Sequence, residues 1–369
     1  MTATPPAADA AEGAGHRRAT IAVHGARLAG PPAPDTPVVA PLVQSVTFVQ
    51  PHGTAEGLRY AGKGNSPNAE LVQRRVALLE GAEAALVTAS GMGATACAML
   101  ALLRPGDHLV SSAWVYGDTQ QLFARELTSF GVEVTFVDPA QSRGWRRALR
   151  KSTRAVFVET PVNPTTRVLD LRPLAQLTRD GGIALVVDST FASPVNFRPL
   201  EHGADVVIHS ATKYLNGHHD VLGGAVVGSA SFVEEARRKM ELWGQAPDPF
   251  ACWLLERGMK TLDVRVRRQS ENARRLAEWC ASRGEIARVL YPGLASHPDH
   301  DVARETLDGY GGMMAIELAG GGEAADRFVR RLRVITHAPS LGVPDGFLRI
   351  TVGIENADDL IADVAQALA

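Results

Sequence analysis

Four short polar clusters in the sequence carry side chains that could do chemistry. They occupy residues 90–93, 159–164, 188–191 and 210–214, and each comes at or just after the end of a short apolar run. In doubly wound α/β folds, ligands bind beyond the carboxyl ends of the strands. We therefore expect the four clusters to lie close together and to form one ligand site.

Two of these clusters are suited to a phosphate and to a nucleophile. Small residues around Gly91 and Met92 let the backbone approach a ligand, and a helix that begins there presents free N–H groups to an anion. Ser210 and Thr212 place two hydroxyls just before Lys213, whose amine, when desolvated, can form a Schiff base near neutral pH. A tight strand-to-helix turn and a solvated surface lysine are the structural alternatives.

The other two clusters offer a carboxylate and an amide. Asp188 closes the apolar run 183–187, and there it could pair with the pyridinium nitrogen of pyridoxal 5'-phosphate (PLP), which keeps the ring an electron sink. Asn163 lies between two stiff prolines, and its amide could bind the phenolic oxygen of the same cofactor. A helix N-cap and a plain proline turn are the alternatives. Together the four clusters predict a PLP site in which Lys213 carries the cofactor.

Short apolar runs alternate with longer amphipathic stretches after a first helix expected at residues 69–80, and this alternation predicts an α/β fold. Such runs are typical of buried parallel strands. The strands are expected at 84–88, 108–111, 132–137, 155–159, 184–188, 205–209 and 224–228. A smaller mixed unit follows, with strands expected at 286–290, 312–318, 332–336 and 347–352 and helices at 299–306, 323–333 and 357–368.

The chain is expected to divide into three parts. Residues 1–55 read as a flexible leader and N-terminal arm, because they are rich in Pro, Gly and Ala and have few periodic apolar positions. Residues 56–245 form the expected large PLP-binding domain. A Gly, Pro and Asp break near 243–249, followed by a long helix expected at 249–282, separates it from a C-terminal α/β domain at 246–369.

Composition excludes several classes of function. The net charge is −2 with acids and bases interspersed, which disfavours binding to nucleic acid or to an anionic membrane, so the expected partner is a small molecule. The three cysteines form no CxxC or Cys/His cluster, which argues against a disulfide framework or structural zinc and for the reducing cytoplasm. His218, His219 and Asp220 are adjacent in one turn. Adjacent side chains in a turn rarely point toward one ion, so no metal is expected. The N-terminus lacks the apolar stretch of a secretory signal or membrane anchor.

The ordered motifs of the chain closely resemble those of the Cys/Met metabolism PLP-dependent enzymes, the transsulfuration family. The resemblance implies fold type I, the aspartate-aminotransferase-like fold, with a mostly parallel sheet in the large domain and a smaller α/β C-terminal domain. The motifs are SGM at 90–92, ETPVNP at 159–164, VDSTFASP at 187–194, HGADVVIHSATKYLNGHHDV at 202–221, RGMKTL at 257–262, YPGL at 291–294 and LRITVGIE at 348–355.

Residue roles follow from this resemblance. It implies that Lys213 forms the Schiff base, that Asp188 binds the pyridine nitrogen, and that Tyr116 stacks on the ring as an acid/base partner whose pKa a nearby cation could lower. It implies a substrate site in which Arg349 binds the α-carboxylate, with Ser340 and Asn163 near it. The implied phosphate ligands are Gly91, Met92, Ser210 and Thr212, with Tyr60 reaching the phosphate of a neighbouring subunit in a homotetramer built from dimers.

Three departures from the family pattern bear on function. Gly62 stands where relatives have an arginine that contacts the phosphate, and Lys63 could supply that charge. The stretch after Gly342 is shorter than in relatives by some tens of residues, which removes part of the expected pocket wall. Asp118 stands where methionine γ-lyases usually have a cysteine.

The favoured function is that of a cystathionine γ-synthase, in which an O-acylhomoserine reacts with cysteine or another thiol. The HAPSLG run at 337–342 and the WGQAPDP stretch at 243–249 look most like synthase relatives. A cystathionine γ- or β-lyase or a cysteine-conjugate C–S lyase uses the same residues and stays the alternative. A catalytically silent PLP-binding protein and an aminotransferase are the readings from other classes.

Overall fold

The computed structural model describes residues 16–25, 33–50, 52–53, 57–337 and 346–369 of the chain. These residues form two compact units, which are described separately. The first comprises residues 1–159 and 171–263, and the second comprises residues 160–170 and 264–369, within the described ranges. The division falls between Asp263 and Val264, whereas the sequence placed a domain boundary at 245/246.

A seven-stranded sheet forms the centre of the first unit, in the order β1-β7-β6-β5-β4-β2-β3. Its inner strands are buried runs of Val, Leu, Ile and Ala, as expected for a sheet covered on both faces. The strands are β1 (Ala84–Thr88), β2 (His108–Ser112), β3 (Glu133–Val137), β4 (Thr153–Glu159), β5 (Ala184–Asp188), β6 (Val206–His209) and β7 (Gly224–Gly228).

All neighbouring strands of this sheet are parallel except at β7. This strand runs antiparallel to both β1 and β6, so the expectation of a parallel strand at 224–228 is wrong. The reason lies in the connection, because no helix crosses over between β6 and β7. The chain instead turns back through residues 210–223, and an antiparallel return needs no crossover helix.

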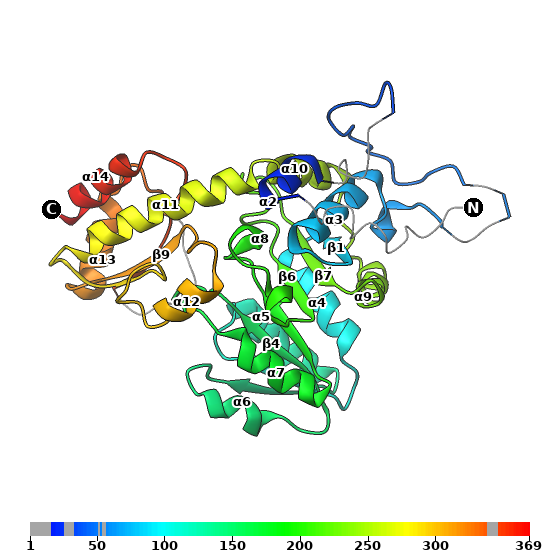
Figure 1. The fold of residues 1–369 in the computed structure, drawn as a ribbon, viewed down its shortest axis with the longest axis horizontal. Coiled ribbons are helices and arrows are strands. Elements are labelled where there is room, and N and C mark those ends of the chain that lie inside the picture. Colours follow the sequence, from blue (N-terminus) through cyan, green and yellow to red (C-terminus); the bar gives the residue numbers. More distant parts are fainter. Residues whose placement is uncertain (1–15, 26–32, 51, 54–56, 338–345) are drawn as a thin grey trace. The chain divides into compact units, whose positions relative to one another are not determined.

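Helices surround the sheet of the first unit (Figure 1). Helix α3 (Pro67–Glu80) begins with Ser66 as N-cap and Pro67 in its first turn, and its C-cap Gly81 has a left-handed conformation. The segment expected as one helix at 249–282 is two, α10 (Pro249–Met259) and α11 (Leu262–Ala281). The remaining helices are α2 (Arg18–His24), η2 (Ala61–Lys63), α4 (Gly91–Leu102), α5 (Gly117–Gln121), η3 (Leu122–Leu127), α6 (Ser142–Ala148), α7 (Leu171–Gly181), α8 (Ser193–Asn196), η4 (Pro199–His202) and α9 (Ala230–Trp243).

The second unit is built on a three-stranded antiparallel sheet in the order β10-β9-β8. Its core packs the sheet against helices through side chains such as Tyr291, Ile316, Phe328 and Val364. The elements are β8 (Ile286–Leu290), α12 (His300–Thr306), β9 (Met313–Leu318), α13 (Gly321–Arg331), β10 (Phe347–Thr351) and α14 (Ala357–Leu368), with most of α11.

One strand expected in the second unit does not form. At 332–336 the backbone N–H groups of Arg333, Val334 and Ile335 donate to the carboxylate of Asp363 on α14, at 2.8, 3.0 and 2.8 Å. A strand ladder would need these donors, and the carboxylate already satisfies them. The segment is therefore an irregular loop anchored to a helix.

Candidate active site

Two of the predicted clusters meet where α4 begins. Ser90 caps α4 by accepting the N–H of Gly93 at 3.0 Å, and the N–H groups of Gly91 and Met92 have no partner within the helix. A Cβ added to Gly91 would lie 2.8 Å from the Cβ and Oγ atoms of Ser210. The first turn of α4 and the turn after β6 are thus in direct contact, and only glycine fits between them.

The turn that carries Lys213 is fixed through its backbone. Ser210 N–H donates to Thr190 Oγ1 at 2.8 Å, and the hydroxyl of Thr212 both donates to the carbonyl of Gly223 and accepts its N–H. Lys213 N–H donates to Ser210 O at 3.0 Å, which closes the turn. The Lys213 side chain is exposed rather than desolvated, and among the residues that the structure describes it makes no ion pair. Its amine is accessible for reaction.

Asp188 is the half-buried last residue of β5. Burial raises the pKa of Asp188, against the opposing effects of two hydrogen bonds from Thr190 and the charge of His209. Thr190 donates its hydroxyl at 2.6 Å and its N–H at 3.0 Å to one carboxylate oxygen. Because Thr190 also receives Ser210 N–H, it links Asp188 to the Lys213 turn. Asp188 makes no direct ion pair with the described residues, and a pyridinium ion would supply one.

Tyr116 precedes α5 and is held by two carboxylates. Its N–H donates to Glu159 Oε2 at 2.8 Å at the end of β4, and its phenol donates to Asp118 Oδ2 at 2.8 Å. The hydrogen bond to Asp118 raises the pKa of Tyr116, and burial adds to this effect. Among the described residues of this chain the phenol thus has a carboxylate beside it, and the lowering of its pKa by a cation stays a prediction. Thr119 on α5 donates to Met92 Sδ at 3.7 Å, which brings the Tyr116 segment to the start of α4.

Asn163 and Arg349 meet within the second unit. Arg349 Nη1 donates to the amide oxygen of Asn163 at 2.7 Å, across 186 positions of the sequence. Arg349 lies on β10 opposite Ala315, and Asn163 belongs to the segment 160–170. Asn163 was expected to bind the cofactor, and here its amide orients the guanidinium. Ser340 lies outside the described residues.

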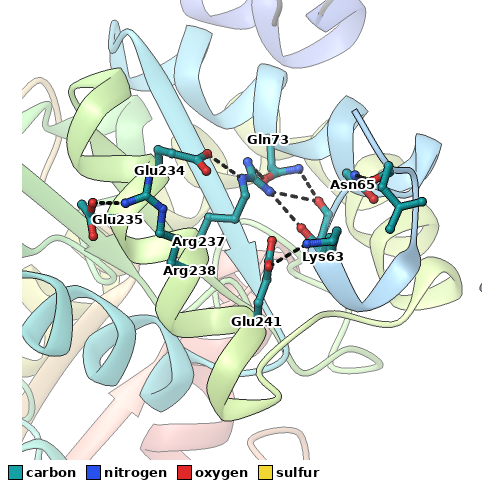
Figure 2. Close-up of polar contacts among 10 residues, drawn as sticks. Lys63, Asn65, Gln73, Glu234, Glu235, Arg237, Arg238 and Glu241 are labelled. Carbon is teal, nitrogen blue, oxygen red and sulfur yellow. Dashed lines mark hydrogen bonds and ion pairs between the residues drawn. The ribbon is translucent and has the colours of Figure 1, made fainter. Parts of the chain in front are cut away.

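Tyr60 and its neighbours form a turn beside α9. Tyr60 is 43% exposed and pairs with Thr47 in an isolated bridge. A Cβ on Gly62 would lie 2.6 Å from Cε1 of Tyr60, so a side chain at position 62 conflicts with this ring. Lys63 Nζ lies 3.0 Å from Glu241 Oε2 (Figure 2), and Arg237 donates to the carbonyls of Lys63 and Gly64. The charge of Lys63 is already neutralised in this chain.

Sequence reasoning gave no role to Glu159, Thr190 or Asp118 as partners of the site. Glu159 and Thr190 belong to the polar clusters at the ends of β4 and β5, so their position at a strand end was a usable signal. Their partners, by contrast, come from tertiary contacts. In the described ranges no group of three or more His, Cys, Asp or Glu could hold a metal ion, and no helix there is long and apolar enough to cross a membrane.

Comparison with known proteins identifies the family. Residues 19–345 match the family described as Cys/Met metabolism PLP-dependent enzyme. The chain is 40% identical to a probable cystathionine gamma-synthase of Herpetosiphon aurantiacus (86% of this chain, 98% of the relative) and 35% identical to the L-methionine gamma-lyase of Fusobacterium nucleatum subsp. polymorphum (89% and 92%).

A solved structure shows the same fold. The cystathionine gamma synthase of Xanthomonas oryzae pv. oryzae, in complex with aminoacrylate and cysteine, superposes with a TM-score of 0.90 at 35% identity, covering 96% of this chain and 98% of the other. The predicted α/β fold of type I with a mostly parallel sheet is confirmed. The cradle of Gly91 and Ser210, the carboxyl group of Asp188 and the accessible amine of Lys213 fit PLP. The chain belongs to the Cys/Met metabolism PLP-dependent enzymes.

Proposed function

We propose that this PLP enzyme catalyses a γ-replacement of the cystathionine γ-synthase type, in which the sulfur of cysteine bonds to the γ-carbon of an O-acylhomoserine and the acyloxy group leaves as a carboxylate. The Tyr116–Asp118 pair carries this proposal. Cysteine brings an ammonium group into the site as a second amino acid, and Asp118 offers it a carboxylate beside Tyr116. A lyase, which handles one amino acid at a time, has no need of such a group.

The residues divide the work as follows. When bound, PLP supplies the electron sink for carbanions of the substrate. Lys213 carries the cofactor and moves protons at the α- and β-carbons, Asp188 holds the pyridine nitrogen, and Tyr116 covers the ring and holds a proton on its phenolic oxygen. The proposed phosphate ligands are Gly91, Met92, Ser210 and Thr212, with Tyr60 of a neighbouring subunit.

Substrate binding is assigned to the second unit. Arg349 binds the α-carboxylate through its guanidinium fork, and Ser340 lies near it in the chain. The hydrogen bond from Arg349 to the Asn163 amide supports this role, because it fixes the plane of the guanidinium before substrate arrives.

The proposed assembly is a homotetramer built from two dimers, located in the cytoplasm. Large apolar side chains are exposed along the N-terminal arm, which supports packing of this arm on a second copy. They are Val38, Val39, Leu42, Val46 and Val49. The three free thiols are buried, which is consistent with a reducing compartment.

A paired assay tests the proposed reaction. One tube contains enzyme, O-acylhomoserine and cysteine, the other contains enzyme and cystathionine alone, and products are identified by mass spectrometry. Cystathionine formed in the first tube is the expected result, and rapid release of 2-oxobutanoate or pyruvate in the second would assign a lyase instead. Lys213→Ala is expected to abolish turnover, whereas Lys151→Ala, at an exposed lysine before β4, serves as the matched control.

A further inference from the structure

A buried acid and a buried histidine face each other behind the candidate site. Glu80 is the last residue of α3, and its Oε1 lies 2.6 Å from Nε2 of His209, the last residue of β6. The two residues are 0% and 1% exposed. Among the described residues, Oε2 of Glu80 has no hydrogen-bond partner although it is buried.

This position is costly for a carboxylate. A buried acid loses its hydration, and one at the C-terminal end of a helix also faces the negative end of the helix dipole. Among the described residues, the contact with the histidine ring is the one hydrogen bond of this carboxylate, and an ionised carboxylate needs a proton on Nε2 to form it. Folding alone would be served better by an apolar pair of similar size. Packing alone therefore does not explain the pair.

The pair is next to the carboxylate proposed to hold the cofactor ring. In the register of the parallel strands, Asp188 of β5 is opposite Ile208 of β6, and His209 is the next residue. Successive side chains of a strand point to opposite faces, so the effect of His209 on Asp188 is electrostatic and not a hydrogen bond. The charge of His209 favours the ionised form of Asp188.

The nearest charged group on a neighbouring element is Arg198, which donates to Leu79 O beside Glu80 at 2.6 Å and to Glu201 Oε1 at 3.1 Å. The neighbouring strand β7 (GAVVG) and the helix α4 (GMGATACAMLAL) contain no acid and no basic residue, and Cys97 on α4 is a buried thiol. Glu201 and His202 of η4 precede β6 and are at the other end of that strand. Glu80, His209 and Asp188 thus form a carboxylate–imidazole–carboxylate series, with Arg198 beside its Glu80 end.

We propose that Glu80 and His209 are positioning residues of the cofactor site, with Glu80 holding the His209 ring through Nε2 at the end of β6, where His209 acts on Asp188 and so on the carboxyl group that faces the pyridine nitrogen. The inference depends on the proposed role of Asp188. His209 is also followed directly by Ser210, so the same pair fixes the start of the turn that carries Lys213. Neither residue needs to touch cofactor or substrate.

Three variants test this in the holoenzyme: Glu80→Gln, His209→Gln and the double variant. The first readout is the pH titration of the visible band of the bound cofactor, and the second is the PLP dissociation constant of the apoenzyme. Each single variant is expected to weaken PLP binding by roughly five- to tenfold. Each variant should move the midpoint of the visible band to higher pH. A pyridine ring that is less protonated withdraws less electron density from the Schiff base to Lys213, which then keeps its proton to higher pH.

The double variant separates electrostatics from packing. It removes both buried ionisable side chains, so thermal stability should recover relative to Glu80→Gln, while the shift of the band should remain. Glu256→Gln is the matched control, because Glu256 makes a buried ion pair with Arg75 of the same helix α3 at 2.6 Å. It should lower stability and leave the band midpoint unchanged.

The outcomes discriminate between the two proposals. If Asp188→Asn moves the midpoint and PLP affinity but all three variants match the wild type within twofold, the positioning role is refuted and the site assignment stands. If Asp188→Asn itself has no effect, the role of Asp188 fails and the positioning role fails with it. A single variant that fails to fold leaves the double variant and the other single variant to decide.

Discussion

Gly91→Ala tests whether the start of α4 and the Ser210 turn share one phosphate site. The added Cβ would lie 2.8 Å from both Cβ and Oγ of Ser210 and 3.1 Å from its Cα. Rotation of the Ser210 side chain relieves only the contact with Oγ, since Cβ and Cα move only with the backbone. That backbone is tied to Thr190 through the N–H of Ser210. One of the two segments must therefore shift.

The size of the effect follows from this geometry. Overpacking of a rigid contact costs about 1–3 kcal/mol. The strain falls on the two segments assigned to the phosphate, so it should appear in cofactor binding more than in global unfolding. Because 1.4 kcal/mol corresponds to a factor of ten, the PLP dissociation constant should rise roughly 5- to 150-fold.

The assay is a PLP titration of apoenzyme followed by fluorescence and by the visible absorption band. Gly284→Ala is the control, because a Cβ there meets nothing within 4 Å. Its dissociation constant should match that of the wild type. If Gly91→Ala folds, as judged by circular dichroism, and binds PLP as tightly as the control, the two segments do not form the phosphate site.

Three further predictions concern titrating groups. Asp118→Asn removes the carboxylate that raises the pKa of Tyr116, so the alkaline limb of the pH–rate profile should move to lower pH. If this limb does not move, Tyr116 takes no part in the proton transfer that limits the rate. Burial lowers the pKa of His297 from 6.5 to about 4, so the unfolded chain binds more protons between these values and stability should be full above pH 6.5 and fall as pH drops toward 4. The free energy of unfolding, measured with urea at pH 7 and at pH 4.5, should fall by up to about 3 kcal/mol less in His297→Gln than in the wild type. An unchanged pH dependence of stability in this variant would contradict the assignment. Burial raises the pKa of all three cysteines to about 12, so no thiol should react with Ellman's reagent in the native protein at pH 8 and all should react after denaturation; fast native labelling would be inconsistent with this burial.

The sequence located most strands because buried strands are continuous apolar runs. Expected and observed ends of β1, β5 and β8 coincide, and the polar clusters do follow the strands that position them. Strand direction at β7 could not be read, since an apolar run has no polarity. The loop at 332–336 was misread because its backbone donors are satisfied by Asp363, a residue about thirty positions later.

The candidate site, like the fold, could be predicted from the sequence only in part. Asp188 and Lys213 could be found from their places at strand ends, because that edge is fixed by topology. The acceptor of the Tyr116 N–H, the orientation of Arg349 by Asn163 and the pairing of Glu80 with His209 join residues 43, 186 and 129 positions apart. No local pattern encodes such pairings, and only the folded chain reveals them.

The excursion of residues 160–170 into the second unit has a consequence for biosynthesis. This segment leaves the ribosome well before its partners, because Arg167 pairs with Asp299 and Asn163 with Arg349. The first unit can begin to fold during translation, but the second must wait for almost the whole chain. Until then the eleven-residue excursion is an unsatisfied loop on the nascent protein, and a chain truncated after residue 263 would keep that loop permanently without its partners.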